Sequence, residues 1–294
     1  MNIMVSYIWR SAHAVTPVLL AGLLATGNIA VAGEIVLPRD RIVALDFDVH
    51  DHSLIKAYSR TLYRSGNDGR DWEPIALPKA IERGHIVSVA VSAQSPATLY
   101  VAGPGIGVLR SADGGGSWDA MNLGLPSNDI VALSSHADQP DTLYVFVAKR
   151  GILRSEDAGG HWRLMDAGPR AKVLQFLHSN MPGSMQTGWF FAATAKGISR
   201  SMDCFCGWRD AGGLGRAVTA VAFDPGQPKQ VYAAAGNGLF VSADGGEHWL
   251  PLPSPSHNIS ALAATPEGTL FAAAGAGELF RSADRGMTWH RANE

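Results

Sequence analysis

Ser242-Ala243-Asp244-Gly245-Gly246-Glu247-His248-Trp249 is one of six copies of a template that decides the fold of this chain. The template is Ser-x-Asp-x-Gly-x-x-Trp, and successive serines are 46, 44, 46, 41 and 40 residues apart. A repeat of about 43 residues is typical of one four-stranded propeller blade. The defining residues of the six copies are Ser65, Asn67 and Trp72; Ser111, Asp113 and Trp118; Ser155, Asp157 and Trp162; Ser201, Asp203 and Trp208; Ser242, Asp244 and Trp249; and Ser282, Asp284 and Trp289.

Each residue type in the template suits a tight turn between two strands. Ser and Asp side chains can hydrogen-bond to the backbone of their own turn, and Gly supplies a positive φ. The Trp begins the next strand and buries a large ring. We therefore predict that these residues are structural and exclude them as catalytic or metal-binding candidates. The first copy has Asn67 in place of Asp, and the fourth has Phe205 in place of Gly.

This repeat resembles the Asp-box, or BNR, repeat, and the resemblance covers nearly all of residues 34–294. Families that carry the repeat include sialidases, sortilin-type receptors, glucan-cleaving propellers and the photosystem II assembly/stability factor family. The chain is closest in character to the last of these. The resemblance implies a β-propeller, but it does not decide the function, because enzymes and binding proteins share this repeat.

We predict an all-β chain with a single six-bladed β-propeller in residues 33–294. Each blade is expected to contain four antiparallel strands, and the six copies of the template favour six blades over seven. A content of 33 glycines and 46% apolar residues in 294 fits many short strands around a large core. The expected blades are 41–77, 86–123, 129–166, 172–212, 217–252 and 257–293.

The first 32 residues read as a signal peptide. A weakly basic start with Arg10 and His13 precedes the apolar run from Val15 to Ala25, and Ala30-Val31-Ala32 fits a cleavage site. The alternative is an uncleaved membrane anchor. Cleavage predicts a periplasmic or secreted protein without stable membrane insertion. The net charge of −2 does not favour a nucleic-acid partner, and we expect a monomer.

Closure of the propeller requires that the first and last blades meet, because open strand edges are prone to aggregation. Glu34-Ile35-Val36-Leu37-Pro38 resembles the segments expected to form outer strands. We predict that this segment pairs beside the third strand of the last blade or extends its short fourth strand.

Basic residues concentrate in the connections expected at one end of the propeller. In the Asp-box family the repeated turns join third and fourth strands, on the side away from the usual ligand channel. The fourth-to-first and second-to-third connections form the opposite, channel-side end. We predict a basic binding face there for an acidic protein client, or else solvated charges without function. Its residues are Arg39, Arg41, Lys79, Arg83, Lys149, Arg150, Arg170, Lys172, Lys196 and Arg216.

Blade four departs from the repeat at Cys204-Phe205-Cys206, next to Met202. In an exported protein the two cysteines suggest a strained local disulfide, and free structural thiols are the alternative. With Met202, His178, Met181 and Met185 nearby in sequence, a copper site is a third interpretation. The stretch 46–52 could also ligate a metal through Asp46, Asp48, His50, Asp51 and His52, although a polar loop is the favoured interpretation.

No residue pattern indicates catalysis. A sialidase needs a three-arginine cluster, whereas the arginines at 64, 110, 154, 200 and 281 occupy one repeat position. A glucan-cleaving enzyme needs two opposed acids over a long cleft, and none stands out. We predict a non-catalytic exported interaction or assembly factor that needs no cofactor. The alternatives are a glycosidase or sialidase-like hydrolase and a periplasmic redox or copper accessory protein.

Overall fold

Every blade is an antiparallel sheet whose four strands follow one another in chain order. The computed structural model describes residues 41–92, 98–184, 188–202, 205, 207–275 and 277–292. These residues form six four-stranded sheets and one 3-10 helix, η2 (Lys79–Arg83). The predicted all-β fold with six blades of four strands is confirmed.

The six blades share one strand order and differ in the lengths of their strands. Blade 1 contains β1 (Ala44–Asp48), β2 (Ser53–Ala57), β3 (Leu62–Ser65) and β4 (Glu73–Ile75). Blade 2 contains β5 (Ser88–Val91), β6 (Leu99–Gly103), β7 (Gly107–Ser111) and β8 (Asp119–Ala120). Blade 3 contains β9 (Ile130–Ser135), β10 (Leu143–Val147), β11 (Gly151–Ser155) and β12 (Arg163–Asp166). Blade 4 contains β13 (Val173–Ser179), β14 (Trp189–Thr194), β15 (Gly197–Ser201) and β16 (Arg209–Asp210). Blade 5 contains β17 (Val218–Asp224), β18 (Gln227–Ala235), β19 (Gly238–Ser242) and β20 (Leu250–Leu252). Blade 6 contains β21 (Ile259–Ala264), β22 (Leu270–Ala274), β23 (Glu278–Ser282) and β24 (His290–Arg291).

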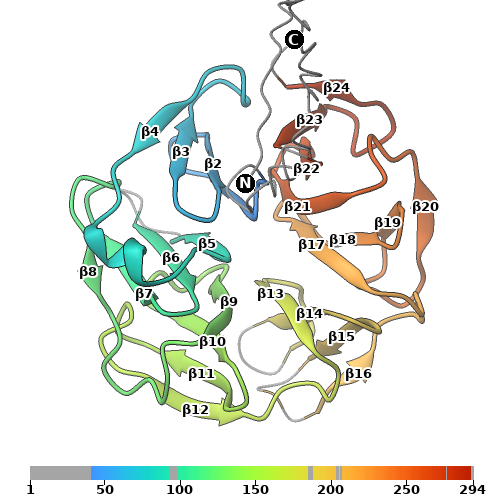
Figure 1. The fold of residues 1–294 in the computed structure, drawn as a ribbon. Coiled ribbons are helices and arrows are strands. Elements are labelled where there is room, and N and C mark those ends of the chain that lie inside the picture. Colours follow the sequence, from blue (N-terminus) through green and yellow to red (C-terminus); the bar gives the residue numbers. More distant parts are fainter. Residues whose placement is uncertain are drawn as a thin grey trace, which may run out of the picture. The chain divides into compact units, whose positions relative to one another are not determined.

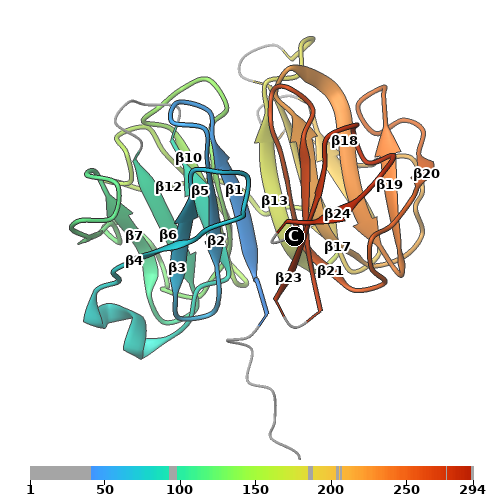
Figure 2. The ribbon, with the colours of Figure 1, turned by 90° about the horizontal axis from the view of Figure 1, so that it is seen from above.

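The first strand of each blade lies innermost and the fourth lies outermost (Figure 1). Each innermost strand packs against the innermost strands of the two neighbouring blades, and β1 packs against both β5 and β21. The first and last blades therefore meet, and the ring of blades is closed. Figure 2, turned by 90°, shows the strands of the blades roughly along the axis of this ring.

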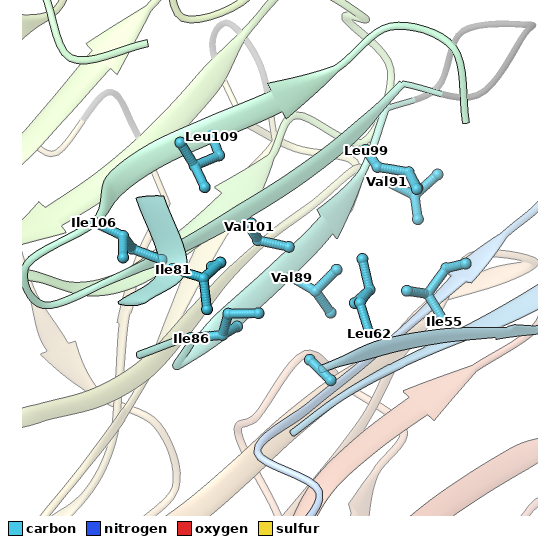
Figure 3. Packing of buried hydrophobic residues seen from close by; sticks show 11 residues of the cluster. Ile55, Leu62, Ile81, Ile86, Val89, Val91, Leu99, Val101, Ile106 and Leu109 are labelled. Carbon is cyan, nitrogen blue, oxygen red and sulfur yellow. The ribbon is translucent and has the colours of Figure 1, made fainter. Parts of the chain in front are cut away.

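A separate hydrophobic cluster fills each junction between neighbouring blades. At the first junction Ile55 and Leu62 of blade 1 meet Val89 and Val101 of blade 2, and Ile81 of η2 covers one end (Figure 3). The junction between blades 6 and 1 is built in the same way. The core of this fold thus consists of six inter-blade layers, which explains why both faces of most inner strands are apolar.

Polar side chains on the innermost strands also join each blade to the next. At the closing junction Ser260 Oγ donates to the carbonyl oxygen of Ile42 at 2.8 Å. Adjacent innermost strands belong to different sheets and form no backbone hydrogen bonds with each other as a β-ladder. These side chains therefore provide partners for backbone N–H and C=O groups at the junctions. The other five junctions are bridged by Asp46 to Val91 N, Ser88 to Leu133 N and O, Ser134 to His178 N, Gln175 to Val221 N, and Thr219 to Ile259 O.

The repeated turn has nearly the same geometry wherever it is described. In the fifth copy Ser242 Oγ accepts the N–H of Gly246 at 2.7 Å and donates to Asp244 Oδ1 at 2.7 Å. Asp244 Oδ1 also accepts the N–H of His248 at 3.0 Å. Gly246 has a φ of +84°, as the turn requires. In the fourth copy Phe205 adopts a φ of +65° at the equivalent position, and its ring is buried between blades 3 and 4.

The tryptophan and the arginine of the repeat connect neighbouring blades at the outside of the ring. The indole N–H of Trp162 donates to the Met121 carbonyl oxygen of the preceding blade at 2.7 Å. Arg281 of blade 6 pairs with Asp68 in the first turn at 3.1 Å, which ties the last blade to the first. Residues 34–38, predicted to close the ring, lie outside the described residues, and their pairing stays a prediction.

Candidate functional site

The basic residues predicted to share a face do lie in connections at one end of the blades. Antiparallel strands place the second-to-third and fourth-to-first connections together, and the repeated turns lie at the other end. All nine described members of the set are exposed: Arg41, Lys79, Arg83, Lys149, Arg150, Arg170, Lys172, Lys196 and Arg216. We call these nine residues the basic face. Arg39 lies outside the described residues.

A hollow of about 580 Å³ brings two members of the basic face together. Arg170 comes from the loop between β12 and β13, and Lys196 comes from the β14–β15 turn. Arg209 and Trp208 complete this hollow, and Asp210 is its one carboxylate. Three cationic side chains beside an indole ring provide charge and apolar surface for an anionic partner.

The loop that carries Arg170 is held by the neighbouring carboxylate. Asp166 Oδ1 accepts the N–H of Gly168 at 2.6 Å and the indole N–H of Trp208 at 2.8 Å. Asp166 therefore positions this loop. We name the hollow lined by Arg170, Lys196, Trp208 and Arg209 the blade-4 groove.

Sequence reasoning missed two basic residues at this end of the ring. Arg60 lies in the connection between β2 and β3 and is exposed. Arg209 lies on β16, directly after the tryptophan of the repeat. Arg60 could have been found from the sequence, because second-to-third connections were assigned to this end. Arg209 could not, because it lies in a strand and not in a connection.

A second cavity, of about 370 Å³, lies at the centre of the ring and is lined by all six innermost strands. Asp46 of β1 is the one carboxylate in its lining. Burial raises the pKa of Asp46 to about 7, although backbone N–H groups of Val91 and Phe47 oppose this shift and the charge of Asp48 adds to it. At neutral pH Asp46 is therefore divided between its two protonation states.

The predicted metal ligands of the stretch 46–52 have structural partners. Asp48 is fully buried and its Oδ1 accepts the N–H of His50 at 2.9 Å, while Asp51 Oδ1 accepts the N–H of Ser53 at 2.9 Å. Both carboxylates thus cap the turn that joins β1 to β2. Within the described ranges no group of three or more His, Cys, Asp or Glu residues is placed to hold a metal.

The histidine and methionine proposed as copper ligands in blade 4 do not converge. His178 packs against His136 with tilted rings at a centroid distance of 3.9 Å between blades 3 and 4, and its Nδ1 accepts the N–H of Ala137. Met181 packs in the cluster between blades 4 and 5. Met202 is also partly buried in that cluster. Cys204, Cys206 and Met185 lie outside the described residues, so the disulfide and copper hypotheses stay predictions.

Burial keeps His136 neutral. Burial lowers the pKa of His136 to about 4; the charge of Asp138 raises this pKa by less, and the charge of Arg154 lowers it. His136 Nδ1 accepts the N–H groups of Asp138 and Gln139 at 3.0 Å each. His136 therefore caps a turn through Nδ1, as Asp48 does through its carboxylate. No helix among the described residues is long and apolar enough to cross a bilayer.

No protein-family model and no curated protein sequence matches the chain. Solved propellers do match it. YCF48 bound to a D1 peptide is 21% identical with a TM-score of 0.56, over 87% of this chain and 82% of that one. YCF48 from Cyanidioschyzon merolae is 20% identical with a TM-score of 0.52, over 87% and 86% of the two chains. The chain is a propeller that resembles YCF48.

GH74 enzymes share the same fold. The GH74 enzyme of Niastella koreensis matches with a TM-score of 0.59 and 14% identity over 86% of this chain. The GH74 xyloglucanase of Xanthomonas campestris matches with a TM-score of 0.60 and 16% identity over 83% of this chain. The chain spans about half of these enzymes, 47% and 52% of their lengths. At these identities the likeness concerns the fold alone.

Proposed function

We propose that this chain is a non-catalytic exported propeller that serves as an interaction or assembly factor and docks an acidic segment of a client protein on its basic face. The blade-4 groove is the observation that carries this proposal. Arg170, Lys196 and Arg209 converge there from three different segments, beside one carboxylate and an indole ring. Clustered guanidinium groups suit carboxylate ligands, and opposite charges accelerate the encounter of two proteins.

The structural comparisons are compatible with a peptide or protein client. A YCF48 propeller of similar fold has been solved with a bound D1 peptide. We do not transfer that client to this chain, because the identity is 21%. The proposal concerns the class of partner, an acidic stretch of polypeptide, and rests on the charges of this chain.

Charge reversal in the groove tests the proposal. We expect Arg170→Glu/Lys196→Glu to abolish enrichment of a specific client when the tagged protein is isolated from its own host after cross-linking. The matched control is Arg70→Glu/Lys229→Glu, which makes the same charge change at the other end of the ring. Enrichment should also fall as salt rises from 50 to about 500 mM. Equal client recovery with both double variants, at every salt concentration, would show that the groove is not the docking site.

Hydrolase activity is the second candidate, favoured by the similarity to GH74 propellers. Turnover of xyloglucan or of fluorogenic sialosides by the purified chain would support it. The redox or copper proposal is tested separately, by mass spectrometry of Cys204 and Cys206 with and without reductant and by metal analysis. A bridged pair supports the disulfide, and retained copper supports the accessory protein.

A further inference from the structure

The wall of the central cavity combines polar and apolar surface in about equal parts. Its exposed large apolar side chains are Val49, directly after β1, and Leu174 of β13. Leu174 is 36% exposed and belongs to the lining of the cavity. A volume of about 370 Å³ lies within the range of small-molecule sites.

Most polar side chains in this wall are occupied by the junctions between blades. Thr219 and Ser260 donate to backbone carbonyl oxygens of the next blade. Ser134 accepts a backbone N–H, and Ser88 bonds to both the N–H and the carbonyl of Leu133. These groups hold the ring together and have little left to offer a ligand.

Asp46 differs from them because it retains acceptor capacity. Its Oδ1 accepts the N–H of Phe47 at 2.9 Å, and its Oδ2 accepts the N–H of Val91 at 2.7 Å. A carboxylate offers about four acceptor positions, so about two remain. In the described part of the chain no Lys, Arg or His nitrogen lies within 4.0 Å of either oxygen.

We propose that the central cavity binds a small organic ammonium ion, with the cation on the Asp46 carboxylate and an apolar body against the surrounding leucine and valine side chains. A buried carboxylate without a cationic partner is costly to ionise, and a ligand cation would remove this cost. A divalent metal ion fits less well, because Ca²⁺ and Mg²⁺ require six or more oxygen ligands and the cavity wall holds one carboxylate.

The surroundings of Asp46 define the pH dependence of this binding. Asp48 is the other acid on its strand. The other titratable residues that line the cavity are His136, directly after β9, and His178 of β13. The segments of β5, β17 and β21 in the wall contribute no titratable side chain. With a pKa of about 7, the ionised fraction of Asp46 grows about 30-fold between pH 5.5 and pH 8. Affinity for a permanent cation should grow by about the same factor.

The experiment uses cyclohexylammonium as the probe and cyclohexanol as its neutral counterpart, titrated calorimetrically into the full chain at pH 5.5, 7 and 8. We expect saturable binding of cyclohexylammonium that strengthens about 30-fold over this range, and at least tenfold weaker binding of cyclohexanol at pH 8. Asp46→Asn should remove both the preference for the cation and its pH dependence. Ligand-observed NMR with the same pair of probes gives an independent measure of occupancy.

A second variant covers the case in which Asp46→Asn does not fold. Leu174→Arg places a tethered cation in the cavity and should block cyclohexylammonium without unfolding the chain, because Leu174 is partly exposed. Equal binding of the amine and the alcohol would overturn the proposal. So would the absence of saturable amine binding at pH 8, or an unchanged pH profile in Asp46→Asn.

Discussion

Asn67 breaks the consensus of the repeat, and restoring the consensus should destabilise the protein. Asn67 Nδ2 donates to Asp71 Oδ2 at 2.8 Å, and Asn67 Oδ1 accepts the N–H of Asp71 at 2.9 Å. In the second copy the donor and the acceptor exchange places, since Ser117 Oγ donates to Asp113 Oδ2 at 2.7 Å. The first turn therefore needs a donor at position 67, because its partner at position 71 is an acid.

The substitution Asn67→Asp would place two carboxylates about 3–4 Å apart, where the side chains are exposed to water. Their repulsion in a high dielectric is about 1 kcal/mol. Loss of the exposed hydrogen bond costs up to about 1 kcal/mol more. We expect Asn67→Asp to lower the free energy of unfolding by about 1–2 kcal/mol, and the melting temperature by roughly 2–8 °C.

Urea denaturation and calorimetry of four proteins test this expectation: the parent, Asn67→Asp, Asp71→Ser and the double variant. The double variant recreates the pair of the second turn and should return to within about 0.5 kcal/mol of the parent, which gives a clear coupling energy. High salt should shrink the penalty of Asn67→Asp, because it screens exposed charges. If Asn67→Asp is as stable as the parent at low salt, the side-chain pairing argued for this turn is wrong.

Three further predictions concern the architecture. Hydrogen bonds from Ser117 to Asp113 and from His161 to Asp157 lower the pKa of each carboxyl to about 2. The stability that these two carboxylates contribute is therefore complete above about pH 4 and is lost towards pH 2, and denaturation curves across this range should show that loss. Ser260→Ala should cost about 1–3 kcal/mol, like Ser88→Ala, because each leaves a buried backbone group without its partner; a neutral Ser260→Ala beside a costly Ser88→Ala would mean that the ring is open in solution. Deleting residues 33–38 should sharply lower the melting temperature, and an unchanged midpoint would refute closure by that segment.

The number and type of blades could be predicted because the information is local in sequence. Each copy of the repeat bends the chain through hydrogen bonds among residues at most four apart, as between Ser242 and Gly246. The spacing of the copies then counts the blades. The alternation of strand direction likewise places the basic connections at one end, so the basic face followed from chain order alone.

The central cavity and the blade-4 groove could not be predicted in the same way, because each brings together residues from different strands and blades. Asp46 and Asp48 flank the same phenylalanine, yet one lines the central cavity and the other caps a turn. Arg209 joins Arg170 and Lys196 only because blade 4 folds beside the loop from blade 3. The local pattern therefore determined the fold, whereas burial and inter-blade distance, which exist only once the ring has formed, decided which charged groups lie in the central cavity and in the blade-4 groove.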